Sequence, residues 1–291
     1  MKNDNYKIVI TSEHKWLNLH LREVIRYKDL ILFFVKRDFI TRYKQTVIGP
    51  LWAIIQPLMT TIVFTVIFGV VAALPTTDVS GDFKIPAFLF FMSGNILWGL
   101  FSSVLNACSN IFINNQGIMG KVYFPRLISP IASTLSHFIT FLIQFAIFVF
   151  LVIVFILKGD ADVTLTPRLV FIPFILLQTL ILSFGCGIIL ASVTTKYRDL
   201  KMLVGFGLHL WQYATPIAYG LCLVSERIPK YTWLYLLNPV TPIITTFRYC
   251  FFGFGFFDLT YYLISWSITI VIFFISLLLF GKIERSFIDC V

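Results

Sequence analysis

The chain has 291 residues, of which 58% are hydrophobic and only 13% charged, and its formal net charge is +9. Soluble domains carry about 25% charged residues, so this composition, with a mean hydropathy of +0.87, excludes an ordinary soluble enzyme or nucleic-acid-binding domain. The positive charge is instead typical of a membrane protein whose basic residues face the anionic cytoplasmic leaflet.

The first predicted element is a helix from Leu21 to Gln45, which contains no Pro or Gly. One side of this helix carries an apolar line formed by Ile31, Val35 and Phe39. A basic stripe is formed by Arg26, Arg37 and Lys44. Its apolar core is too short to cross a bilayer. We therefore expect an amphipathic helix in the cytoplasmic interface, with the basic stripe toward lipid phosphates. A helix packed on the protein is the alternative.

Six long stretches without Asp, Glu, Lys or Arg follow, over approximately residues 52–74, 87–113, 127–157, 169–195, 202–224 and 259–281. Each is long enough for a helix that crosses a hydrocarbon core of about 30 Å. The predicted fold is an all-α polytopic membrane protein with six transmembrane helices. Residues 1–50 form a cytoplasmic N-terminal segment, and residues 51–291 form the transmembrane domain. Pro216 is expected to kink the fifth span.

The distribution of basic residues predicts the orientation. With both termini cytoplasmic, the inner segments 1–51, 114–126, 196–201 and 282–291 hold seventeen of the twenty-three Lys and Arg residues. This asymmetry agrees with the positive-inside rule. The inner loops around residues 114–126 and 194–201 are candidate docking surfaces for a partner. The outer segment 225–258 is rich in aromatic residues and interrupted by prolines, which predicts short re-entrant or interfacial helices at the mouth of a conduit.

The spans contain few groups that could bind ions or perform chemistry. Apart from Cys and Tyr, their ionisable side chains are His137 and His209, and a lone histidine in an apolar helix is more often hydrogen-bonded packing than a proton relay. A secondary carrier, a selective channel and an enzyme are therefore disfavoured. No metal-ligand spacing is present. Asn115 stands where a phosphate loop has its first glycine and Val122 stands where it has Ser or Thr, so ATP and Mg²⁺ would bind another polypeptide.

Several motifs resemble the polysaccharide-exporting ABC-2 permeases, the membrane subunits that export O-antigen, capsule and teichoic acid. The run from Arg37 to Pro57, RDFITRYKQTVIGPLWAIIQP, is the longest match. Others follow in order along nearly the whole chain: KVYFPRLISP from Lys121, KYRDL from Lys196, Leu237-Asn-Pro239, Phe247-Arg248 and Glu284-Arg-Ser-Phe. Family members often have Asp or Glu where Thr245 stands, so no acidic role is carried over to that position.

The resemblance implies a homodimer in the bacterial inner membrane, driven by two copies of an ATPase subunit. The substrate implied is a lipid-linked polysaccharide, moved outward. ATPase coupling is expected from a helix between spans two and three, at Asn115, Gln116, Gly117, Gly120, Lys121, Tyr123 and Phe124. The cytoplasmic opening is expected at Arg37, Arg42, Tyr43, Lys44, Gln45 and Trp52. The outer gate is expected at Asn238, Pro239 and Arg248.

Aromatic side chains give a physical reason for a sugar substrate, because their flat faces stack on sugar rings while OH and NH groups bond hydroxyls. Most of the phenylalanines are expected to pack or face lipid. The predicted channel lining near the outer mouth consists of Trp211, Tyr213, Tyr219, Tyr231, Trp233 and Tyr235. Trp211 and Tyr213 lie about 200° apart on a helix, so one of them is expected to pack elsewhere. The alternative functions are export of teichoic acid, capsule, or a small lipid or drug.

Overall fold

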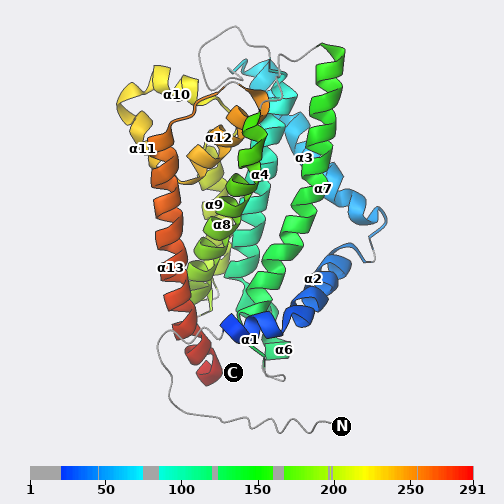
Figure 1. The fold of residues 1–291 in the computed structure, drawn as a ribbon, viewed down its shortest axis with the longest axis vertical. Coiled ribbons are helices and arrows are strands. Elements are labelled where there is room, and N and C mark those ends of the chain that lie inside the picture. Colours follow the sequence, from blue (N-terminus) through cyan, green and yellow to red (C-terminus); the bar gives the residue numbers. More distant parts are fainter. Residues whose placement is uncertain are drawn as a thin grey trace.

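The structure is a computed structural model that describes residues 21–44, 46–74, 85–119, 124–159, 167–195, 197, 199–253 and 255–290. Within these ranges the regular elements are all helical, which confirms the predicted all-α class. Figure 1 shows the long helices running side by side along the longest axis of the molecule. Helices α1 and α6 and the C-terminal end of α13 lie at one end, and α10 and α11 lie at the other.

The helices in chain order are α1 Leu21–Arg26, α2 Lys28–Tyr43, α3 Trp52–Phe64, α4 Ala87–Ser109, α5 Ile111–Asn114, α6 Gln116–Met119, α7 Ile128–Lys158, α8 Ile172–Thr194, α9 Leu200–Tyr213, α10 Leu221–Arg227, α11 Thr232–Leu237, α12 Val240–Phe252 and α13 Leu259–Cys290. A 3₁₀ turn, Gly49–Leu51, precedes α3, and a π-helical segment, Thr65–Val71, extends it. Further 3₁₀ turns, Pro167–Phe171 and Pro229–Tyr231, precede α8 and α11.

Helices α4 and α8 form the centre of the bundle. In their most apolar stretches 78% and 61% of the residues are buried, against 6% for the helix that includes α3. A glycine makes the close approach of the two central helices possible. A Cβ atom on Gly187 of α8 would lie 2.5 Å from the Cβ atom of Cys108 on α4. Small residues allow this kind of backbone contact where helices have no water to exclude.

The prediction of six spanning helices is met only in part. Five helices are long and apolar enough to cross a membrane in the described part of the chain: Gly49–Val71, Ala87–Ser109, Ile128–Lys158, Pro167–Thr194 and Leu259–Gly281. The expected fifth span, 202–224, is instead the 14-residue helix α9, an irregular segment and α10. At 1.5 Å per residue α9 is about 21 Å long, which is shorter than a hydrocarbon core.

The break after α9 has a local cause at Pro216, and it is a full interruption, not the predicted kink. A proline at this position would remove a helical hydrogen bond and push its ring against the carbonyl of Gln212. The helix ends at Tyr213, and the chain passes through turns to Gly220, where α10 begins in an extended backbone conformation. The short helices α10, α11 and α12 occupy the predicted re-entrant region, whose depth in a membrane stays a prediction.

The N-terminal helix differs from the prediction in two respects. It is divided at Tyr27 into α1 and α2, and α2 packs on α7 with Phe34 and Val35 buried. Apolar side chains also occupy its exposed side, where Leu32 and Phe33 are more than 60% exposed. The helix is therefore not amphipathic in the simple sense. It is packed on the protein along one side and carries apolar residues on the other.

Candidate functional site

A cavity of about 410 Å³ opens between α2, α3, α4, α7 and α9. Its volume lies in the range of small-molecule sites, about 300–1,000 Å³. The lining consists of Arg42, Tyr43, Trp52, Ala53, Gln56, Pro57, Thr60, Asn95, Trp98, Gly99, Leu100, Ser103, His137, Thr140, Phe141, Gln144 and Gln212. These residues contain no carboxylate. Most of the polar ones are neutral amides and hydroxyls, an unusual concentration for helices otherwise made of apolar residues.

One end of the cavity carries its positive charge. Arg42 on α2 donates hydrogen bonds to His137 Nε2 at 2.9 Å and to Thr140 Oγ1 at 3.1 Å, both on α7. His137 Nδ1 lies 2.8 Å from the carbonyl oxygen of Ser133. A carbonyl oxygen can only accept, so Nδ1 carries the proton and Nε2 is the acceptor for Arg42. The predicted packing role of His137 is thus confirmed, and the contact fixes α2 against α7.

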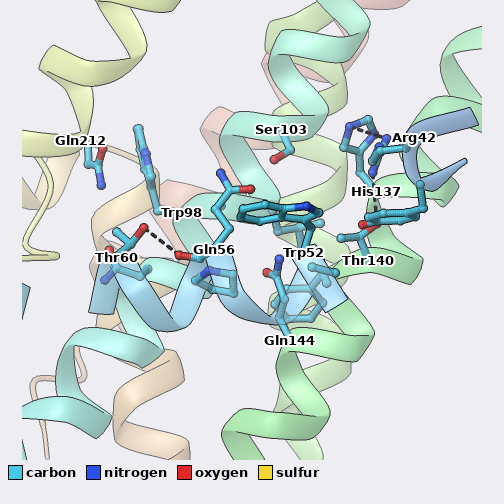
Figure 2. Close-up of a pocket in the computed structure, with 17 residues that line it drawn as sticks. Arg42, Trp52, Gln56, Thr60, Trp98, Ser103, His137, Thr140, Gln144 and Gln212 are labelled. Carbon is cyan, nitrogen blue, oxygen red and sulfur yellow. Dashed lines mark hydrogen bonds between the residues drawn. The ribbon is translucent and has the colours of Figure 1, made fainter. Parts of the chain in front are cut away.

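The rest of the cavity combines indole rings with neutral polar groups. Figure 2 shows Arg42, His137 and Thr140 at one end and Gln212, Trp98 and Thr60 at the other, with Trp52 and Gln56 between them. Trp52 is 46% exposed, whereas Trp98 is buried and packs edge-to-face against Trp211. The wall therefore offers one accessible indole, on Trp52, and several donors and acceptors from separate helices.

Helix α3 brings backbone polarity to the same wall. Pro57 lies inside α3 and has no N–H group, so the carbonyl oxygen of Ala53 loses its intrahelical donor. Ala53 and Pro57 both line the cavity. Thr60 donates its hydroxyl to the carbonyl oxygen of Gln56 at 3.0 Å, which bends or loosens this turn further. Pro57 thus leaves the carbonyl oxygen of Ala53 without its usual intrahelical donor at this wall.

The residues predicted at the cytoplasmic opening separate into two groups. Arg42, Tyr43 and Trp52 line the cavity together. Arg37 points elsewhere: its guanidinium forms an ion pair with Asp38 at 2.7 Å and donates to Asn115 Oδ1 at 3.3 Å. The guanidinium of Arg37 therefore has partners within the protein, while the orientation of the basic stripe toward lipid stays a prediction. Lys44 is exposed, and Gln45 lies outside the described residues.

Helix α6, which contains Gln116 and Gly117 of the predicted ATPase-coupling residues, lies at the same end of the bundle as α1 (Figure 1). Asn115 separates α5 from α6, while Gln116 and Gly117 are exposed on α6. Phe124 is buried and packs edge-to-face against Phe34 of α2, with ring centroids 5.5 Å apart. Gly120, Lys121 and Tyr123 lie outside the described residues. Within the described residues, this loop contacts α2 through the hydrogen bond between Arg37 and Asn115 and through the rings of Phe34 and Phe124.

The predicted aromatic lining does not gather around the cavity. Trp211 packs inward against Trp98 and Phe101. Tyr219 is also engaged, because its hydroxyl donates to the carbonyl oxygen of Tyr213 at 2.9 Å and its ring contacts Tyr235. The exposed members are Tyr213, Tyr231 and Trp233.

The predicted outer-gate residues hold the broken segment in place. Asn238 accepts a hydrogen bond from Trp211 Nε1 and donates one to Thr215 Oγ1, each at 3.0 Å. The carbonyl oxygen of Pro239 accepts from Ser265 of α13 at 2.7 Å. Arg248 is 1% exposed and contacts the segment after α9. Together they connect α9, α12 and α13.

Sequence reasoning missed the amides of the cavity. It searched the apolar stretches for ionisable groups, whereas the cavity is built mainly from neutral ones. The signal was present, because Gln56, Asn95, Gln144 and Gln212 each interrupt a different apolar stretch. Among the residues that the structure describes, no cluster of His, Cys, Asp and Glu could hold a metal ion.

A bundle of long apolar helices is the architecture of a multi-pass membrane protein. The chain belongs to the ABC-2 type transporter family, whose profile matches residues 29–252. This confirms the family that the motifs resemble.

Among its relatives is the O-antigen export system permease protein RfbA of Klebsiella pneumoniae, 28% identical over 266 residues, which cover 90% of this chain and 94% of that protein. The protein of the same name from Myxococcus xanthus is 26% identical, and the alignment covers 80% of this chain and 84% of that protein. The polysialic acid transport protein KpsM of Escherichia coli is 27% identical, over 73% of this chain and 77% of its own.

Proposed function

We propose that this chain is the membrane-spanning permease subunit of an ATP-driven exporter that moves a lipid-linked, O-antigen-like polysaccharide outward across the bacterial inner membrane. The observation that carries the proposal is the carboxylate-free cavity lined by amides, hydroxyls and the exposed indole of Trp52. Membership of the ABC-2 family and relatives named for O-antigen export support it.

The chemistry of the cavity suits a sugar polymer better than a small ion. An indole face stacks on the apolar face of a sugar ring, and amides both donate to and accept from hydroxyl groups. Such contacts are individually modest, so a polymer exchanges one for the next as it moves. An ion-coupled carrier would require a charged ligand set at membrane depth. The cavity lining instead contains Arg42 as its one permanently charged residue.

The subunit works as a homodimer with two ATPase subunits in this proposal. The helix that includes α3 is only 6% buried along its apolar stretch, although it contributes Gln56 and Thr60 to a polar cavity. Polar groups at membrane depth need protein or water around them. A second copy facing α3 would enclose the cavity and complete the path. ATP and Mg²⁺ bind the ATPase, whose movement reaches this chain through the loop around Asn115.

Capsule export is the second candidate, because KpsM is named for polysialic acid transport. The two candidates differ in the charge of the polymer, since sialic acid units are anionic. Arg42 could pair with one anionic group at its end of the cavity, whereas the amides and hydroxyls of the remaining lining suit uncharged sugar units. Genes for glycosyltransferases beside the gene for this chain would identify the glycan class directly.

The test measures surface polysaccharide per folded transporter in cells that lack the gene and receive variants together with the ATPase. Trp52→Leu removes the exposed indole of the cavity and should lower export severalfold, whereas Trp52→Phe retains an aromatic face and should be milder. Phe150→Leu is the matched comparison, because Phe150 is 63% exposed but lies outside the cavity. Full export by Trp52→Leu would contradict the proposed path. Failure of the wild-type chain to restore any glycan would contradict the function.

A further inference from the structure

Asn95 is a buried polar residue of the cavity wall whose side chain forms no hydrogen bond within the described part of the chain. The residue is 8% exposed, and both its carboxamide oxygen and its carboxamide nitrogen are buried without a partner. Burying an amide in this way forfeits the hydrogen bonds that it made with water in the unfolded chain. Asn95 nevertheless lies in the centre of the bundle, on α4, where an apolar side chain would pack without this cost.

The position of Asn95 indicates where its partner lies. Asn95, Gly99 and Ser103 are spaced at four residues on α4 and line the cavity from one face of the helix. Neither carboxamide atom of Asn95 has appreciable accessible surface in this conformation, so the amide reaches the cavity that the residue lines only when its side chain turns toward it. A partner outside the protein would then belong to whatever fills the cavity.

The surroundings define the chemistry of that partner. Gln56, Gln144 and Gln212 add three carboxamides from α3, α7 and α9, and the lining contains no carboxylate. A carboxamide presents a donor and an acceptor at once, which matches a hydroxyl group that does the same. The charged pair of Arg42 and His137 lies at one end of the cavity (Figure 2). The remaining wall is thus suited to uncharged, hydroxyl-rich units.

We propose that Asn95 is a sugar-binding residue, whose carboxamide exchanges hydrogen bonds with hydroxyl groups of an uncharged sugar unit that lies in the cavity. The proposal rests on the proposed function and extends it by assigning a residue and the substrate chemistry that it selects. Asn95 gives up stability in the empty protein and recovers hydrogen bonds when a sugar unit is present. This predicts opposite effects of one substitution on stability and on binding.

The experiment uses the full chain with its ATPase subunit in nanodiscs, and uncharged oligosaccharides, maltohexaose and a mannan fragment, as probes. Asn95→Leu has nearly the same shape but no polar atom. It should weaken binding, measured by tryptophan fluorescence, by about three- to tenfold, the equivalent of one hydrogen bond. Its midpoint of thermal unfolding without sugar should equal or exceed that of the wild type.

Thr61→Val is the matched control, because Thr61 Oγ1 is also buried without a partner but lies outside the cavity lining. It should unfold at the same or a higher temperature and bind the oligosaccharides with unchanged affinity. Asn95→Ser, which is smaller and keeps a hydroxyl, serves if Asn95→Leu does not fold, and it should also bind more weakly.

Wild-type affinity in the folded Asn95 variants would overturn the proposal and leave the amide with water as its partner. In that case a wild-type complex that still binds the probes and exports glycan would leave the proposed function standing. A wild-type complex that neither binds nor exports would contradict the proposed function itself.

Discussion

Arg248 donates a hydrogen bond of 2.8 Å to the carbonyl oxygen of Pro216 and thereby joins α12 to the break that follows α9. It donates a second to the carbonyl oxygen of Ile217 at 3.1 Å. The guanidinium carbon also lies 3.7 Å from the centroid of the Phe90 ring. A Cβ atom on Gly94 would come within 2.9 Å of the guanidinium, so glycine leaves room for it. One buried side chain therefore contributes two of the hydrogen bonds that hold the irregular segment.

Replacing Arg248 with lysine should destabilise the protein although the charge is kept. Lysine lacks the planar fork that reaches several carbonyl oxygens at once. The loss of one charged hydrogen bond corresponds to about 1.5–3 kcal/mol. Thermal unfolding in detergent should show a lower midpoint for Arg248→Lys, while Arg227→Lys, at the exposed end of α10, should behave as wild type. Equal unfolding midpoints for Arg248→Lys and Arg227→Lys would contradict the role of Arg248 in holding the irregular segment.

The contact between Trp211 and Asn238 permits a graded test of the outer segment. Trp211→Phe keeps an aromatic ring against Phe101 but removes the Nε1 donor, at a cost of about 0.5–1.5 kcal/mol. Asn238→Leu should cost more, because it removes the partner of Trp211, of Thr215 and of the Val240 N–H group. Unfolding midpoints should rank wild type above Trp211→Phe and Trp211→Phe above Asn238→Leu. The reverse order would show that ring packing, and not this network, holds the segment.

Coupling to the ATPase is expected to depend on the contact between Arg37 and Asn115. Arg37→Gln removes the hydrogen bond that connects α2 to the loop between α5 and α6. It should lower glycan export per ATP hydrolysed, while membrane insertion stays normal. Lys36→Gln, on the exposed side of the same helix, is the control. If Arg37→Gln leaves coupling unchanged, residues 120–123 become the expected site of coupling to the ATPase. Lys121→Ala and Tyr123→Ala would then test them.

Energy supply gives a prediction about the isolated chain. The purified protein should neither bind nor hydrolyse ATP, because residues 115–122 lack the first glycine and the Ser/Thr of a phosphate loop. Hydrolysis in the reconstituted complex should require the second subunit. The measurement is phosphate release by the chain alone and with the ATPase. Release by the chain alone, insensitive to removal of contaminating ATPases, would contradict its role as a subunit without catalytic activity.

Much of the fold could be predicted from the sequence because length and apolarity alone constrain a membrane helix. The stretches at 87–113 and 127–157 became α4 and α7 almost as expected. The stretch at 202–224 did not form one helix, because the apolar character of a stretch does not show whether a proline kinks the helix or ends it. Here the helix ends at Tyr213, before Pro216. Its broken backbone depends on Arg248, which is 32 residues away in sequence.

The candidate site was harder to predict because its residues are neutral and distant in sequence. Arg42 and His137 are separated by 95 positions, and only the fold brings them to 2.9 Å. Trp52 was expected at the cytoplasmic opening and does line the cavity. Trp211 was expected in the channel lining. The next residue, Gln212, faces a different side of the helix and lines the cavity instead.

The predicted aromatic lining at the outer mouth remains to be tested, and the structure separates its members by the effect that each should have. Tyr219→Leu removes the hydroxyl that bonds to Tyr213 and the ring that contacts Tyr235, so it should lower the amount of folded protein. Tyr213 is 61% exposed, so Tyr213→Leu should fold normally.

Surface glycan per folded transporter is therefore the quantity to compare for these two variants. If Tyr213 stacks on the polymer, leucine should lower this ratio and phenylalanine should largely preserve it, because the ring face is retained. Tyr231→Leu and Trp233→Leu should follow the same rule if the lining extends to α11. An unchanged ratio for all three exposed positions would identify them as residues at the membrane interface, and it would leave the cavity around Trp52 and Asn95 as the place where the sugar is held.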